Sequence, residues 1–179
     1  HSSMSAKAAS FLKKNARVRT IVSLPSPHTV GGKMWDAELS TKAYANPEES
    51  IEACIPIINN ELKNLADLGI DEVQLDEPWL CDVPNPTYQI SESIKYIDKE
   101  LDVYVRSIND VVKGIDGTSI SLHVCGHTSP TTSYNSDWAY DALMEAISKM
   151  NVDRVTIAMT GPNLDGFKVL KAFPHDKLI

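Results

Sequence analysis

The chain has 179 residues, of which 42% are hydrophobic and 23% charged, and its formal net charge is -7. That length can enclose one sizeable core, and the composition excludes a disordered chain. The acidic balance argues against a nucleic-acid-binding module, and no stretch approaches the roughly eighteen apolar residues of a membrane span. The three cysteines are widely spaced and predict no disulfide framework. The N-terminus lacks the pattern of a signal peptide, so we expect a cytoplasmic protein.

The first residues have a different character from the rest of the chain. His1-Ser2-Ser3-Met4 has the form of a purification-tag remnant joined to a starting Met. We therefore expect residues 1–4 to be a tag remnant and residues 5–179 to form one domain.

The predicted elements alternate between helices and strands. Apolar residues three and four positions apart predict the helices, and runs rich in β-branched residues predict the strands. Glycine and proline mark several boundaries: Asn46-Pro47 is a typical helix start, and Gly69 is a typical helix end. A long connection over 29–46 is of a length that is usually functional or disordered. The expected helices are 5–14, 46–68, 91–112, 138–150 and 164–172, and the expected strands are 17–24, 72–78, 118–124 and 154–159.

This order of elements predicts an α/β fold with a parallel sheet. An open doubly wound sheet and a (β/α)8 TIM-type barrel both fit the alternation. The doubly wound fold predicts a glycine-rich phosphate-binding turn after a strand, and the sequence has none. A complete barrel needs about 250 residues, so we expect an incomplete barrel of about four to five βα units, with residues 177–179 at the start of the next strand. If complete as given, such a chain is expected to pair with another copy or to be inactive.

Polar side chains gather where the predicted strands end. In both architectures the functional groups lie at the carboxyl ends of the strands. The opposite strand ends carry helix-terminating glycines and surface charges. This asymmetry predicts a site at the carboxyl edge. The residues concerned are Ser23 and Ser26 after the first strand, Asp76 and Glu77 after the second, and His123 and Cys125 after the third.

His123 and Cys125 are two positions apart at the end of a strand. Residues i and i+2 point to the same side of a strand, so an imidazole and a thiolate can converge on one ion. Nitrogen and sulfur donors together suit zinc. Gly126 permits a sharp turn that would return His127 toward the site. The alternative is a buried histidine hydrogen-bonded to a neighbour beside a core cysteine.

Asp76 and Glu77 end an apolar strand just before a proline. Burying unpaired carboxylates costs several kcal/mol, so we expect this pair to bind a cationic group such as a substrate ammonium. The alternative is a helix cap or a structural salt bridge.

Cys81 is a possible metal ligand but better explained as a packed loop residue. Cys54 lies on an apolar helix stripe and is expected in the core, whereas His28 is expected to be a loop residue rather than a catalyst.

These residues carry a family resemblance. The segment 73–78 (VQLDEP), followed by His123-Val124-Cys125, resembles the catalytic domain of cobalamin-independent methionine synthase. The strand end SLPSP at 23–27 and the strand VTI at 155–157 have similar order and spacing, so the resemblance runs from about residue 17 to 179. The wider superfamily, which includes uroporphyrinogen decarboxylase and coenzyme M methyltransferases, consists of (β/α)8 barrels.

The resemblance implies a zinc-dependent transfer of a methyl group to the sulfur of homocysteine. Zinc would bind the substrate thiol and lower its pKa, so that a thiolate forms at neutral pH. By the same resemblance, His123 and Cys125 would be zinc ligands, and Asp76 would hold the homocysteine ammonium. Ser23 or Ser26 would lie near its carboxylate.

The methyl donor implied by the resemblance is methyltetrahydrofolate, or methylcobalamin supplied by a corrinoid protein, as in short archaeal-type relatives. By the same resemblance, the family takes a third zinc ligand, a glutamate, from the strand that here reads VTIAM at 155–159, where Ala158 stands at about that position, and a fourth, a cysteine, from a later strand. His127 or Cys81 could replace them. Two other functions fit the same residues: zinc-dependent alkyl transfer to another thiol such as coenzyme M, and a non-catalytic relative that binds a ligand.

Overall fold

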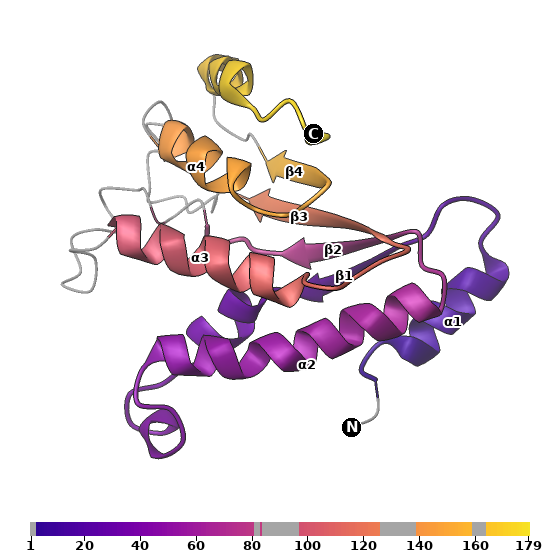
Figure 1. Ribbon diagram of the computed structural model, residues 1–179, viewed down its shortest axis with the longest axis horizontal. Helices are drawn as coiled ribbons and strands as arrows, with labels where there is room; N and C mark the ends of the chain where they lie inside the picture. The colour runs from indigo at the N-terminus through magenta and orange to yellow at the C-terminus, as the bar shows by residue number, and fades with distance from the viewer. Residues whose placement is uncertain (1–2, 81–82, 84–96, 126–138, 159–163) are drawn as a thin grey trace.

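The computed structural model describes residues 3–80, 83, 97–125, 139–158 and 164–179. A four-stranded parallel sheet with the order β1-β2-β3-β4 forms its centre, and the four arrows point the same way in Figure 1. The expected α/β fold with a parallel sheet is therefore confirmed. The strands are β1 (Ile21–Pro25), β2 (Glu72–Asp76), β3 (Ser119–Cys125) and β4 (Arg154–Ala158).

Helical segments connect the strands. Asn46 caps the longest helix with its side chain, which accepts a hydrogen bond from the Glu49 amide at 2.9 Å. Gly69 follows that helix with φ +74°, a left-handed conformation that favours glycine. The helices are α1 (Ala6–Asn15), α2 (Pro47–Asp67), α3 (Ile97–Val111) and α4 (Ala139–Ser148). The shorter segments are a π-helix η1 (His28–Gly32) and the 3-10 helices η2 (Ser40–Lys42) and η5 (Leu164–Ala172).

The hydrophobic core lies between α2, α3 and α4 and one face of the sheet. Alternate strand residues such as Val73 and Leu75 are fully buried in one cluster with residues of all three helices. Alternation explains why every second residue of each strand faces the helices. The buried cluster includes Leu62 and Leu65 from α2, Tyr104 and Ile108 from α3, Leu143 and Ile147 from α4, and Leu122, Val124 and Val155 from the strands.

The other face of the sheet is polar. The residues between the core positions point away from the helices and lie beside one another in the parallel register. We call this surface the polar face. It comprises Ser23 of β1, Gln74 and Asp76 of β2, Ser121, His123 and Cys125 of β3, and Arg154 and Thr156 of β4.

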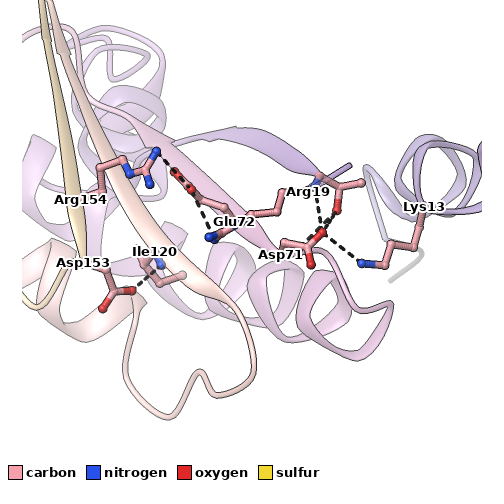
Figure 2. Close-up of polar contacts among 8 residues, drawn as sticks. Lys13, Arg19, Asp71, Glu72, Ile120, Asp153 and Arg154 are labelled. Carbon is pink, nitrogen blue, oxygen red and sulfur yellow. Dashed lines mark hydrogen bonds and ion pairs between the residues drawn. The ribbon is translucent and has the colours of Figure 1, made fainter. Parts of the chain in front are cut away.

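The amino end of the sheet is held by acidic side chains (Figure 2). Asp71, which precedes β2, accepts hydrogen bonds from the amide and the hydroxyl of Thr20 at 2.8 and 2.7 Å. It also forms an ion pair with Lys13 of α1 at 3.1 Å. The hydrogen bond from the Thr20 side chain is the largest cause that lowers the pKa of Asp71. Asp153, which precedes β4, accepts from the Ile120 amide at 2.8 Å. These contacts join neighbouring strands at the edge opposite the predicted site.

Some elements differ from the expectation. The first strand begins at Ile21 rather than residue 17, because its register partner Glu72 is the first residue of β2. The connection 29–46 contains η1 and η2, and the last helix is of the 3-10 type. Leu178 pairs in parallel with Arg154, where the next strand was expected. Among the described residues, no helix combines the length and the apolar character needed to cross a membrane.

Candidate functional site

Asp76 and His123 lie side by side at the carboxyl edge of the sheet. They are register partners on β2 and β3, and Asp76 Oδ1 is 3.2 Å from His123 Nδ1. Their side chains are 36% and 29% exposed, so both can meet a ligand from the polar face. Cys125 is half-buried and follows His123 by two positions, which places it on the same face. The structure thus brings together three of the residues singled out in the sequence.

Gln74 belongs to this group and was missed in the sequence. Its Nε2 lies 2.8 Å from Asp76 Oδ1 and 3.3 Å from Ser23 Oγ. Ser23, Gln74, Asp76 and His123 therefore form a hydrogen-bonded row across β1, β2 and β3. The signal that could have found Gln74 was its position two residues before Asp76 on the same face of the strand.

Ser26 and Glu77 come together away from the polar face. Both are fully buried, and the Ser26 hydroxyl donates a hydrogen bond to Glu77 Oε2. The Thr29 hydroxyl donates to Glu77 Oε1 at 3.3 Å. Burial raises the pKa of Glu77 to about 7, although the hydrogen bonds from Ser26 and Thr29 act in the opposite direction. The structure therefore separates Glu77 and Ser26 from the Asp76–His123 pair, and their predicted contact with substrate stays a prediction.

His28 lies next to Glu77 as the first residue of the π-helix, so its expected place in an irregular loop is wrong. The physical reason is packing: Gly31 brings η1 against the backbone of α2 near Ile51. The His28 ring stacks on Tyr104 of α3 with centroids 3.7 Å apart, and its Nδ1 is 4.0 Å from Glu77 Oε1. Burial, with a smaller contribution from Lys33, lowers the pKa of His28 to about 3. The imidazole is therefore neutral at physiological pH.

His123 and Cys125 offer the donor types that zinc prefers. An imidazole and a thiol share the polar face at the end of β3, so the two side chains fit one side of a zinc site. Ala158 of β4 is the register partner of Cys125 and carries no donor. Within the described ranges, no group of three or more His, Cys, Asp or Glu side chains is placed to hold a metal ion. Cys81 and His127 lie outside the described residues.

The sequence comparisons agree on one family. Residues 42–179 match the family described as "Cobalamin-independent synthase, Catalytic domain". A methionine synthase of Sulfolobus acidocaldarius is 26% identical over 149 residues, which cover 83% of this chain and 36% of the relative. A methionine synthase of Pyrococcus horikoshii is 35% identical over 118 residues, which cover 64% of this chain and 28% of the relative. The chain thus spans about a third of the length of these relatives.

The structural comparison supports the same fold. A B12-independent methionine synthase from Shewanella sp. W3-18-1, solved in complex with selenomethionine, aligns with a TM-score of 0.77 and 20% identity. The alignment covers 100% of this chain and 49% of that chain. The four βα units therefore have the arrangement of part of a TIM-type barrel, as the sequence predicts.

Proposed function

Because the chain belongs to the cobalamin-independent methionine synthase family, we propose that it takes part in zinc-dependent methyl transfer to the sulfur of homocysteine, giving methionine. The methyl donor is methyltetrahydrofolate or methylcobalamin. The observation that carries the proposal is the contact of Asp76 with His123 at 3.2 Å, with Cys125 on the same face. This contact unites the two motifs that distinguish the family resemblance.

In this proposal His123 and Cys125 would hold a zinc ion on the polar face. When bound, zinc lowers the pKa of the substrate thiol and so supplies a thiolate nucleophile at neutral pH. Asp76 is accessible and offers a negative charge to the homocysteine ammonium. The exposed Ser23 on the neighbouring strand offers a hydroxyl to the substrate carboxylate.

The reaction forms a sulfur–carbon bond as the bond from the methyl group to its donor breaks. The thiol gives up its proton before or during that step. The donor keeps the electron pair of the broken bond, and with methyltetrahydrofolate the donor nitrogen takes up a proton. The described residues contribute by orienting the amino acid: Asp76 and Ser23 hold its two charged ends on β2 and β1. Two contacts fix the orientation of the substrate sulfur relative to the donor. They should therefore raise the rate more than either contact alone, because orientation removes part of the entropic barrier.

A second function has a specific observation in its favour. Ala158 is paired with Cys125 where the family supplies a glutamate ligand. A site with fewer protein donors binds zinc more weakly. This favours a non-catalytic relative that binds an amino acid on the polar face. Alkyl transfer to another thiol, such as coenzyme M, would use the same metal ligands. An assay that compares homocysteine with the other thiol as acceptor distinguishes it from methionine synthesis.

Metal analysis and methyl transfer test the proposal on the purified chain. We expect about one zinc per chain, lost in His123→Ala and in Cys125→Ala, and kept in the matched control Cys54→Ala on α2. We expect methionine from homocysteine with methyltetrahydrofolate or, failing that, with methylcobalamin. A chain that binds no zinc would overturn the proposal. A chain that binds zinc and homocysteine but transfers no methyl group would favour the non-catalytic function.

The setting of the reaction is part of the proposal. We place it in the cytoplasm, with homocysteine as the small-molecule substrate and a corrinoid protein as partner where methylcobalamin is the donor. Association of two copies of the chain is a further expectation. Sedimentation of the purified chain tests it, since a monomer at every concentration would contradict it.

A further inference from the structure

Gln74 is the one member of the hydrogen-bonded row to which the proposed function gives no task. We propose that Gln74 is a positioning residue: it holds the Asp76 carboxylate, and Asp76 then fixes the His123 tautomer that carries its hydrogen on Nδ1. That tautomer leaves Nε2 as the nitrogen open to a metal. The use of this tautomer for binding a metal rests on the proposed function, whereas the dependence of the tautomer on Gln74 does not.

The direction of each hydrogen bond follows from the chemistry of the carboxylate. An ionised carboxylate only accepts hydrogen bonds, so Gln74 must turn its amide nitrogen, and His123 a protonated Nδ1, toward Asp76 Oδ1. The two distances to that oxygen are 2.8 and 3.2 Å. The second amide hydrogen of Gln74 is directed at Ser23 Oγ, 3.3 Å from Nε2. Gln74 can satisfy both neighbours only in this orientation.

The strands place these groups without help from the loops. Gln74 and Asp76 are two positions apart on β2 and therefore share a face. Their register partners are Ser23 on one side and His123 on the other. Parallel strands lie about 4.8 Å apart, a distance that short polar side chains bridge. The row is thus built on rigid elements, which suits a positioning role.

The fixed tautomer matters for a metal ligand. Histidine ligands commonly donate their second ring N–H to a carboxylate, which orients the ring and makes the ligating nitrogen more basic. Loss of such a partner typically weakens metal binding by about 10- to 100-fold. Without Gln74, Asp76 Oδ1 would lose one of its two donors and the carboxylate could rotate away from His123.

Nitrogen-15 NMR of the metal-free chain, at a pH where imidazoles are neutral, tests this inference. A His123→Gln spectrum assigns the His123 signals. In the wild type we expect Nδ1 to show the chemical shift of a protonated nitrogen. In Gln74→Met, which keeps the chain length without a donor, Nδ1 should move toward the shift of a bare nitrogen, and in Asp76→Ala it should move further. A His123 that is protonated mainly on Nε2 in the wild type would overturn the inference.

A matched control separates positioning from general disturbance of the sheet. Ser121 is the register partner of Gln74 on β3, and its hydroxyl has no hydrogen-bond partner among the described residues. Ser121→Ala should leave the His123 tautomer unchanged. Gln74→Glu, which places a second carboxylate beside Asp76, replaces Gln74→Met if that variant fails to fold, and it should also disturb the tautomer. An unchanged tautomer in a folded Gln74 variant would contradict the inference.

The test distinguishes this inference from the proposed function because it needs neither metal nor substrate. If the tautomer depends on Gln74 and the chain transfers no methyl group, the inference holds and the proposed reaction is contradicted. If methyl transfer occurs and the tautomer is unchanged in the Gln74 variants, the inference is wrong and the proposed reaction is supported.

Discussion

At the residue scale, the Glu77 carboxyl is the buried acceptor that joins the end of β1 to the end of β2. It accepts from the Ser26 and Thr29 hydroxyls, and the Glu77 amide donates to the His123 carbonyl at 2.9 Å. Glu77→Ala removes the acceptor of the buried Ser26 hydroxyl, whereas the half-buried Thr29 hydroxyl keeps the Asp76 carbonyl at 3.1 Å as an acceptor, so we expect the free energy of unfolding to fall by about 1–3 kcal/mol. Glu77→Gln keeps one acceptor oxygen and should lower the free energy of unfolding by less than half as much. Urea unfolding measures the loss in both variants, and equal small losses would contradict the role of Glu77 as a buried acceptor.

His28 predicts a stability that depends on pH. Its pKa is lowered from 6.5 to about 3 in the folded chain, so below pH 6.5 the unfolded chain binds a proton that the folded chain does not. Stability should therefore fall as the pH falls from 6.5 toward 3. His28→Phe keeps the stacking on Tyr104 and removes this loss. Relative to the wild type, the variant should gain about 2 kcal/mol between pH 7.5 and pH 5.

The His28 prediction is measured as the difference between variant and wild type. Glu77, whose pKa is raised, ionises in both proteins, so its opposite pH dependence largely cancels in that difference. His175→Phe, at an exposed position, is the control for the exchange of a histidine for a phenylalanine in itself. A His28→Phe chain that parallels the wild type from pH 7.5 to 5 would show that the imidazole ionises in the folded state.

The sequence placed the accessible candidate residues better than the buried ones. That Asp76, His123 and Cys125 lie together was predictable because all three stand at strand ends, which meet at one edge of a parallel sheet. Gln74 was not singled out, because a glutamine two positions before Asp76 on a strand is equally typical of a solvated face. Only the register, which pairs it with Ser23, shows its hydrogen bonds.

At the element scale, Gly31 allows the π-helix η1 to lie against the backbone of α2. A Cβ at this position would lie 2.6 Å from the Ile51 backbone and from the Ser50 carbonyl oxygen, neither of which can move without displacing the helix. Gly31→Ala should therefore destabilise the chain by about 1–3 kcal/mol and displace His28 from Tyr104. Thermal unfolding and the aromatic circular dichroism signal measure the two effects.

Gly32 provides the matched control for Gly31. A Cβ there would meet the His28 ring and the Ile51 side chain at 3.3 Å, and a side chain can yield by a few tenths of an ångström. Gly32→Ala should cost clearly less than Gly31→Ala. Equal losses would mean that the close approach of η1 to α2 does not decide the stability of this segment.

Most elements were predictable to within a few residues because their apolar spacing follows the helix or strand period. The start of α2 at Pro47 and its end before Gly69 match the sequence pattern closely. The π-helix was not predictable, since Pro25, Pro27 and two glycines are typical of a loop. Its helical form depends on contact with α2, a tertiary effect that local patterns do not contain.

At the scale of the whole molecule, the described residues place the apolar core on one side of the sheet. Parallel sheets usually carry apolar residues on both faces because both are covered. Here the helices cover Leu75, Leu122 and Val124, while the opposite side of the same strands is the polar face. This one-sidedness explains how a single sheet can both stabilise the fold and present the candidate site.

Neighbouring residues of β3 test this asymmetry directly, because Leu122 and Ser121 are both fully buried and point to opposite faces. Leu122→Ala leaves a cavity under the helices, so it should lower the free energy of unfolding by about 3–5 kcal/mol. Ser121→Ala removes a hydroxyl without a hydrogen-bond partner in the described part of the chain, so it should be neutral or slightly stabilising. Urea midpoints measure both. A comparable loss in Ser121→Ala would mean that the polar face contributes to the fold as much as the core does.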